Sequence, residues 1–129
     1  MDRLQKMVLE FHKTLGHLYK SKPVAEIDDA VTRLRIALID EKTDELACAM
    51  YDGNLAEIAD RLADLLYIVY GCALAYGIDL EPVFREVHKA NMQKVGSPVS
   101  ENGKIGEPSG WQGANITANL AMLSERSIG

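Results

Sequence analysis

Two acid-rich stretches separated by a short turn decide the fold of this chain: residues 39–46 read IDEKTDEL, and residues 57–67 read EIADRLADLLY. Apolar side chains in and around both stretches recur at intervals of three and four residues, which is the spacing of an amphipathic α-helix. Between them, Asp52-Gly53-Asn54 is typical of a turn in which glycine ends the first helix. Because the connection is so short, we expect the two helices to be antiparallel neighbours.

The carboxylates of these stretches fall on one side of each expected helix. Glu41 and Glu45 are four residues apart and share a stripe on the first helix. Asp60 and Asp64, together with Glu57, form a stripe on the second. If the stripes face each other, like charges converge and resist desolvation, and a hard cation such as Mg²⁺, which prefers oxygen ligands and bridges to phosphates, removes that penalty. The pattern therefore predicts a metal site, although acids that simply face water would give the same spacing.

The rest of the chain predicts an all-α fold, a four-to-five-helix bundle with an irregular C-terminal arm. We expect a single domain, 1–129, with a helical core of about 2–94 and an arm of about 95–129, because residues 95–113 contain five glycines and two prolines. The helix centre at 62–75 is mostly apolar and is expected to be the most buried element. The expected helices cover about 2–19, 28–51, 55–76, 81–94 and, weakly, 116–124.

Composition and charge exclude several classes of protein. The chain has 129 residues, a formal net charge of −5 and a sequence pI of about 5.1, so it has no bulk attraction for nucleic acid or for an anionic membrane. It has neither a secretory h-region nor an apolar run long enough to span a membrane, so we expect a cytoplasmic protein. Cys48 and Cys72 lie in apolar helical contexts without metal-site spacing, and are expected to be buried, reduced thiols.

Several motifs, in this order and spacing, resemble the MazG-like all-α NTP pyrophosphatase superfamily, which includes dimeric dUTPases and phosphoribosyl-ATP pyrophosphatases. The resemblance spans nearly the whole chain and rests on its hallmark, EExxE, a spacer and then ExxD. Beyond the two acid-rich stretches, it is carried by 64–71 (DLLYIVYG), 84–94 (FREVHKANMQK), Phe11-His12 and Gly110-Trp111.

The resemblance implies an enzyme that hydrolyses a nucleoside triphosphate, or a related nucleotide, to the monophosphate and pyrophosphate, in a house-cleaning role for the nucleotide pool. It implies Mg²⁺, with Mn²⁺ as a substitute. The carboxylates of the two stripes, Glu41, Glu45, Asp60 and Asp64, are the candidate ligands. Glu41, at the N-terminal end of the stripe, is the candidate to orient or deprotonate the attacking water. It also implies a homo-oligomer, a dimer or tetramer, with sites near the subunit interface. The apolar circumference of residues 62–76 independently favours a helical partner.

Two departures from the hallmark leave the activity open. EExxE falls on Glu41, Lys42 and Glu45, and ExxD falls on Arg61 and Asp64, so a cation stands at two acidic positions. In one alternative the ligands have moved to four-residue spacing, while Lys42 and Arg61 bind phosphate at the edge of the site. In the other, the two cations pair with the acids, which leaves a weakened enzyme or a silent nucleotide-binding or regulatory homologue.

Further candidates for contact with substrate lie on the fourth helix and the arm. Asn91 and Lys94 are suggested by the resemblance, although Lys94 could equally be a solvated helix end. His88 shares their face and is expected to be a structural hydrogen-bond partner. Trp111, the one tryptophan, could stack on a base or anchor the arm to the protein's own surface. The sequence does not specify which base or sugar is bound.

Overall fold

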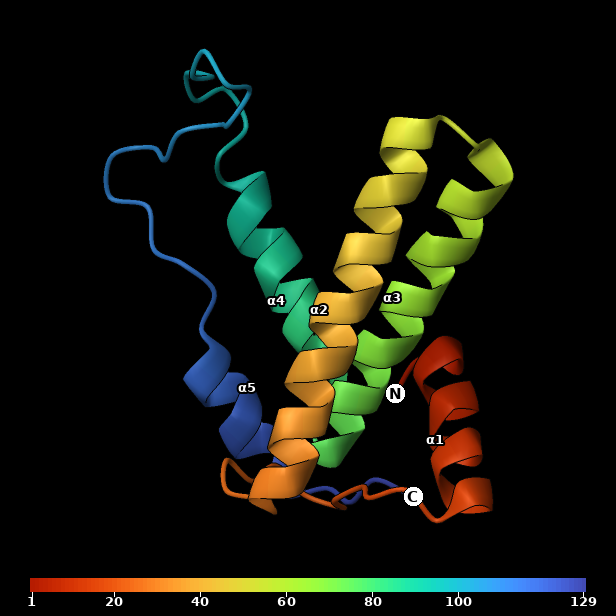
Figure 1. Cartoon of the computed structure of the whole chain (residues 1–129). Helices are drawn as coiled ribbons and strands as arrows, with labels where there is room; N and C mark the ends of the chain where they lie inside the picture. Colours follow the sequence, from red (N-terminus) through yellow and green to blue (C-terminus); the bar gives the residue numbers. More distant parts are fainter.

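Five α-helices make up the regular structure of the chain, as described by a computed structural model of all residues 1–129 (Figure 1). There are no strands, only an isolated bridge between Val99 and Ile105 in the arm. The predicted all-α fold is therefore confirmed. The helices are α1 (Arg3–Leu15), α2 (Asp29–Asp52), α3 (Leu55–Ala75), α4 (Leu80–Met92) and α5 (Ile116–Leu123).

The longest two helices, α2 and α3, form an antiparallel hairpin, as the sequence predicted (Figure 1). Gly53 ends α2 in the left-handed conformation, with φ of 68°, and its N–H donates to the carbonyls of Ala49 and Met50. Asn54 then caps α3 by accepting a hydrogen bond from the backbone N–H of Glu57 at 3.2 Å. One left-handed residue followed at once by an N-cap reverses the chain with no intervening loop.

The register of the hairpin follows from this turn. Residues that meet across it lie at equal sequence distances from Gly53: Glu45 contacts Arg61, and Arg35 lies opposite Gly71. A Cβ atom on Gly71 would be 2.7 Å from Nη1 of Arg35, so the glycine makes room for this buried guanidinium. The helix faces that carry these residues are thus held against each other along the hairpin.

Helix α1 packs beside the C-terminal half of α3 (Figure 1) and is shorter than predicted. Val8 and Leu9 meet Leu74 of α3 in a small buried core. The prediction that this helix runs to about residue 19 is wrong, because Gly16 adopts φ of 69° and its N–H caps the last turn. The left-handed glycine ends the helix at Leu15 although apolar spacing continues beyond it.

Helix α4 follows α3 after a bend of 113° and packs with α5, and its C-terminal end diverges from the α2–α3 hairpin (Figure 1). Gly77 occupies the corner, where a Cβ would lie 2.1 Å from the carbonyl oxygen of Lys22. No single helix has both the length and the apolar composition of a membrane span; α3 and α4 meet that test only when taken together across their bend.

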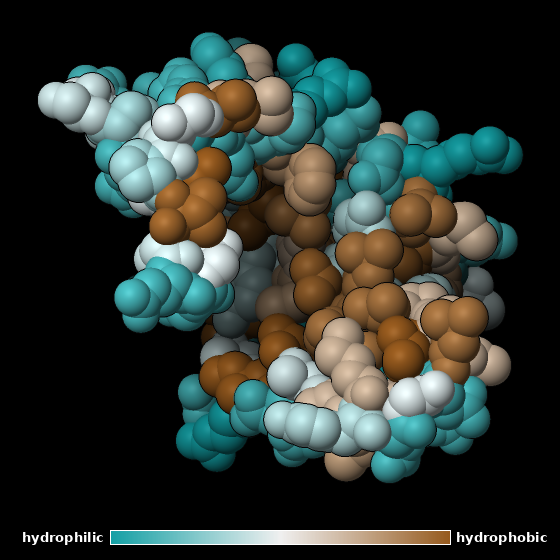
Figure 2. All heavy atoms as spheres, turned by 90° about the horizontal axis from the view of Figure 1, so that it is seen from above, coloured by the Kyte–Doolittle hydropathy of each residue, from teal (hydrophilic) through white to brown (hydrophobic).

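Only 14 of the 129 residues are buried, which is a small core for a chain of this length. The prediction that α3 is the most buried element holds for its last turns, at Gly71 and Ala73–Ala75, whereas Leu66 is 44% exposed. Cys48 is exposed, which corrects the expectation of a buried thiol, because nothing in the single chain covers its side of α2. Cys72 is half-buried, and both cysteines are free. Figure 2 shows hydrophobic side chains exposed around a hollow.

Candidate functional site

Four charged side chains meet across the hairpin, and we refer to Lys42, Glu45, Arg61 and Asp64 as the charged cluster. Nη1 of Arg61 lies 3.0 Å from Oε2 of Glu45 and 3.7 Å from Oδ2 of Asp64. Nζ of Lys42 lies 3.5 Å and 3.9 Å from the same two oxygens. Each cation is therefore shared by both carboxylates.

Helical spacing and the hairpin register together build this cluster. Lys42 and Glu45 are three residues apart on α2, as are Arg61 and Asp64 on α3, so each pair shares a face of its helix. The side chains are between 21% and 41% exposed. Ion pairs with this access to solvent contribute only about 0–1 kcal/mol each, since water screens them. These ion pairs therefore contribute little to the stability of the hairpin, and their members can change partners.

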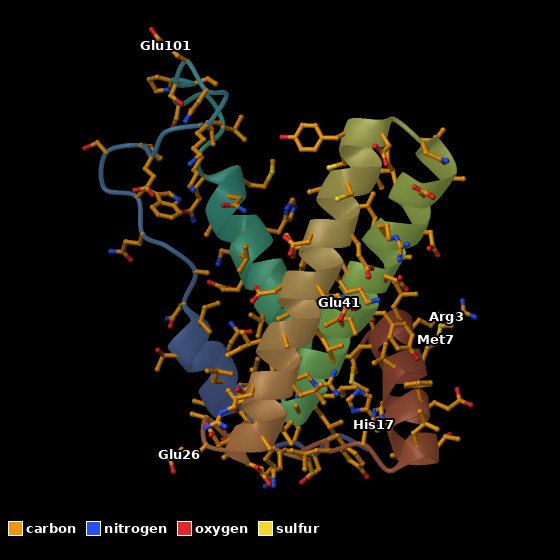
Figure 3. The ribbon with its side chains drawn as sticks, in the orientation of Figure 1. Arg3, Met7, His17, Glu26, Glu41 and Glu101 are labelled. Carbon is orange, nitrogen blue, oxygen red and sulfur yellow. The ribbon has the colours of Figure 1, made fainter.

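The other two predicted metal ligands stay outside the cluster. Glu41, labelled about midway along α2 in Figure 3, and Asp60 on α3 are both exposed and form no ion pair. No group of three or more His, Cys, Asp or Glu side chains converges in an arrangement that could hold a metal ion. Carboxylate oxygens are suitable ligands for a hard divalent cation. In the single chain, however, the placement of these carboxylates does not suit one, because Glu45 and Asp64 form ion pairs with Lys42 and Arg61.

Two of the predicted substrate contacts, Lys94 and Trp111, meet each other just beyond α4, which ends at Met92 and not at the predicted residue 94. Nε1 of Trp111 donates to the carbonyl of Ala90 at 2.8 Å, and Nζ of Lys94 lies 4.5 Å from the centre of the indole ring. The single chain therefore has the arm anchored on the last turns of α4. Asn91 is exposed, and so is His88, which makes no hydrogen bond and is not the structural partner expected from the sequence.

A buried polar pair that sequence reasoning missed joins α1 to the hairpin. His12 is 2% exposed and Arg35 is 7% exposed. Nη2 of Arg35 lies 3.3 Å from Nε2 of His12, and Nδ1 of His12 lies 3.0 Å from the carbonyl oxygen of Leu18. Because Nε2 accepts a hydrogen bond from the guanidinium, Nδ1 carries the ring proton and donates a hydrogen bond to the carbonyl oxygen of Leu18. The available signal was that His12 lies four residues after the core residue Val8, on an apolar stripe.

Burial and charge keep His12 neutral. Burial lowers the pKa of His12 below its usual range, and the charge of Arg35 adds to this against the opposing effect of the Leu18 hydrogen bond. Burial also lowers the pKa of Arg35 and raises the pKa of the neighbouring Cys72 thiol. No carboxylate pairs with Arg35, and its Nε has no hydrogen-bond partner. The contact between α1 and the hairpin thus tolerates the charge of Arg35, and a second positive charge on His12 would disrupt it.

Comparison with known proteins assigns the family. Residues 8–91 match the model of the family described as phosphoribosyl-ATP pyrophosphohydrolase. The chain belongs to this family. The match contains the charged cluster and ends just before the arm, and it confirms the resemblance to the MazG-like all-α NTP pyrophosphatase superfamily. The chain is also 36% identical over 93 residues to the uncharacterized protein L479 of Acanthamoeba polyphaga mimivirus. That alignment covers 69% of this chain and 34% of L479, so the chain spans about a third of this curated relative.

The neutrality of His12 predicts how stability depends on pH. The pKa of His12 is lower in the folded chain than its ordinary value of about 6.5 in the unfolded chain, so the unfolded chain binds more protons below that pH. The stability that neutral His12 contributes is therefore fully present above about pH 6.5, and it is lost as the pH falls towards the pKa of His12 in the folded chain. We expect His12→Asn, which keeps a donor and an acceptor, to show a smaller difference in unfolding free energy between pH 7.5 and pH 5.5 than the unmodified chain.

Urea unfolding at one fixed protein concentration measures this difference. His88→Asn makes the same substitution at an exposed site on α4 and should leave the pH dependence in place. If His12→Asn retained the full pH dependence of the unmodified chain, another group would be responsible.

Proposed function

We propose that this family member hydrolyses a nucleoside triphosphate, or a related nucleotide, to the monophosphate and pyrophosphate, and so removes unwanted nucleotides from the pool. The observation that carries the proposal is that the family match spans a hairpin on which two cations and two carboxylates meet within 3.0–3.9 Å. The cations are suited to bind a phosphate chain, and the carboxylates are suited to assist its hydrolysis.

Lys42 and Arg61 are the proposed phosphate ligands. The chain carries a formal net charge of −5, so a polyanion is bound only where cations are concentrated. Both side chains lie at the hairpin surface, and guanidinium and ammonium groups are strong donors to phosphate oxygens. Their present partners are carboxylates in weak, half-exposed pairs, so phosphate can replace those partners at low cost.

Glu41 is the proposed group that orients or deprotonates the attacking water. It lies one helical turn before Glu45 and has no cation of its own, so its carboxylate is free to accept a proton. The proposal also includes a divalent cation, Mg²⁺ or Mn²⁺, with oxygen ligands drawn from Glu41, Glu45, Asp60 and Asp64. Glu45 and Asp64 can bind this cation only when Lys42 and Arg61 no longer pair with them.

A second copy of the chain is part of the proposal, as a dimer or tetramer. Two apolar hollows flank α3: one of 190 Å³ against α1 and one of 490 Å³ against α4. They share Leu66 and Tyr70, so they form one continuous apolar face. A face of this kind is costly to leave in water, and a helical partner would cover it. Asn91, Lys94 and Trp111 are proposed to contact the nucleotide near such an interface.

Light scattering behind size-exclusion chromatography tests the oligomer. We expect a mass of at least twice 14.2 kDa and, for Leu66→Glu at the centre of the apolar face, a shift towards the monomer. Leu55→Glu, at an exposed position at the tip of the hairpin, is the matched control and should keep the parent mass. A monomeric parent chain would refute the oligomer.

One observation favours a second candidate, a nucleotide-binding homologue without turnover. Lys42 and Arg61 neutralise Glu45 and Asp64, and in a silent homologue these pairs would persist when a nucleotide is bound. Such a protein would bind nucleotide without opening these pairs and would release no pyrophosphate.

The deciding experiment measures pyrophosphate release from a panel of canonical and modified nucleoside triphosphates with Mg²⁺, Mn²⁺ or EDTA. We expect release from one or a few of them that stops with EDTA, and a fall of about 10²-fold or more in Glu41→Gln, in line with the loss of a general base. Asp44→Asn, an exposed neighbour on α2, is the control and should keep full turnover. Binding of nucleotide without release would establish the silent homologue instead.

A further inference from the structure

A hollow of 270 Å³ lies where parts of the chain that are far apart in sequence meet. Its lining comes from the start of α1, the linker after α1, the corner between α3 and α4, and the segment that follows α5. Figure 1 shows this last segment passing beneath the helices towards α1. No member of the charged cluster lines the hollow, so it is a separate feature of the molecule.

Specific contacts hold the walls of this hollow in place. The N–H of Ile128 donates to the carbonyl of Ser21 at 2.7 Å, which ties the last segment to the linker. Nζ of Lys13 donates to the oxygen of Gly129 at 3.1 Å, which holds the same segment against α1. At the corner, a Cβ on Gly77 would lie 2.1 Å from a backbone oxygen of the linker. The hollow is therefore formed before a ligand binds, and a ligand need not order it.

Two cations that line this hollow have no partner. The side chains of Lys6 and Arg126 form neither an ion pair nor a hydrogen bond with the rest of the chain. The one acidic side chain in the lining, Asp79, is already paired with the amino group of Met1 at 3.1 Å. The chain has 19 acidic and 14 basic residues, yet two positive charges at this hollow remain without a counterion.

The chemistry of the lining matches a small phosphate monoester. Such a group carries about −1.5 to −2 charges at pH 7, so it balances both free cations, whereas a carboxylate balances only one. Guanidinium and ammonium groups are strong donors to phosphate oxygens, and Ser21 and Ser127 add hydroxyl groups to the lining. The volume is just below the range of about 300–1,000 Å³ for drug-sized ligands. A small organic part can therefore accompany the phosphate, beside the apolar Leu123 and Ile128.

We propose that this hollow is a second anion site, which binds a small phosphate monoester through Lys6 and Arg126. Lys6 lies on α1 and Arg126 follows α5, so a bound phosphate joins these two parts of the chain. A ligand that binds only the folded chain also stabilises it by mass action. The inference goes beyond the proposed function, because the hollow and the charged cluster share no residue.

Calorimetry with glycerol 3-phosphate in EDTA tests the site. We expect Lys6→Gln and Arg126→Gln each to weaken binding roughly three- to tenfold, because each removes one charged donor to the phosphate. Arg3→Gln removes an exposed cation of the same helix that does not line the hollow, and should change the affinity by less than about twofold. Lys6 and Arg126 are exposed, so both variants should keep the fold, which circular dichroism verifies.

Three further titrations separate the alternatives. Inorganic phosphate should bind more weakly through the same two residues, and glycerol should not bind; equal affinity for inorganic phosphate would show that the assignment to an ester is wrong. Lys42→Gln should keep the affinity of the parent chain, which separates this hollow from the charged cluster and from the proposed function. Absence of binding, binding that survives unchanged in Lys6→Gln and Arg126→Gln, or binding lost in Lys42→Gln overturns the second site.

Discussion

The left-handed turn at Gly53 sets the register of α2 against α3, and the candidate site depends on that register. With one residue reversing the chain and Asn54 capping the next helix, positions equally distant from the turn must meet. Lys42 and Glu45 then lie across from Arg61 and Asp64, near the middle of the hairpin. A shift of a single residue would rotate each helix face by about 100° and separate the charges.

Farther from the turn, the same register helps to bring together a second set of polar side chains, and these are buried. Arg35 meets Gly71 and His12 where α1 covers the hairpin, and there the charge is buried without a carboxylate. In the charged cluster, by contrast, charges of both signs are present and water reaches them. The buried pair therefore has the properties of a fixed junction, while the exposed cluster has those of a site that can exchange ligands.

Much of this fold was predictable, because helical spacing and turn residues act locally. The sequence predicted α2, α3 and their antiparallel pairing from the apolar spacing and from Asp52-Gly53-Asn54, and it singled out Glu45 and Asp64. It offered the pairing of Lys42 and Arg61 with those acids as one of two alternatives and could not choose between them, since the choice depends on side-chain direction across two helices. Gly16 is itself a local signal for the end of α1, although the apolar spacing continues beyond it.

Burial was the least predictable property, because it depends on what covers a surface. Cys48 and the middle of α3 have apolar neighbours in sequence, yet the single chain leaves them exposed. The buried His12 and Arg35 show the converse, since only the packing of three helices encloses these polar side chains.

The charged cluster on α2 and α3 is proposed to bind the phosphates of a nucleotide. Backbone amide ¹H–¹⁵N spectra recorded while inorganic triphosphate is added test it most directly, because triphosphate carries the recognised group without any choice of base. We predict that the largest shifts fall at residues 41–45 and 60–64 and are lost in Lys42→Gln. Shifts centred elsewhere, for example on α4 and the arm around Trp111, with residues 41–45 unchanged, would contradict it.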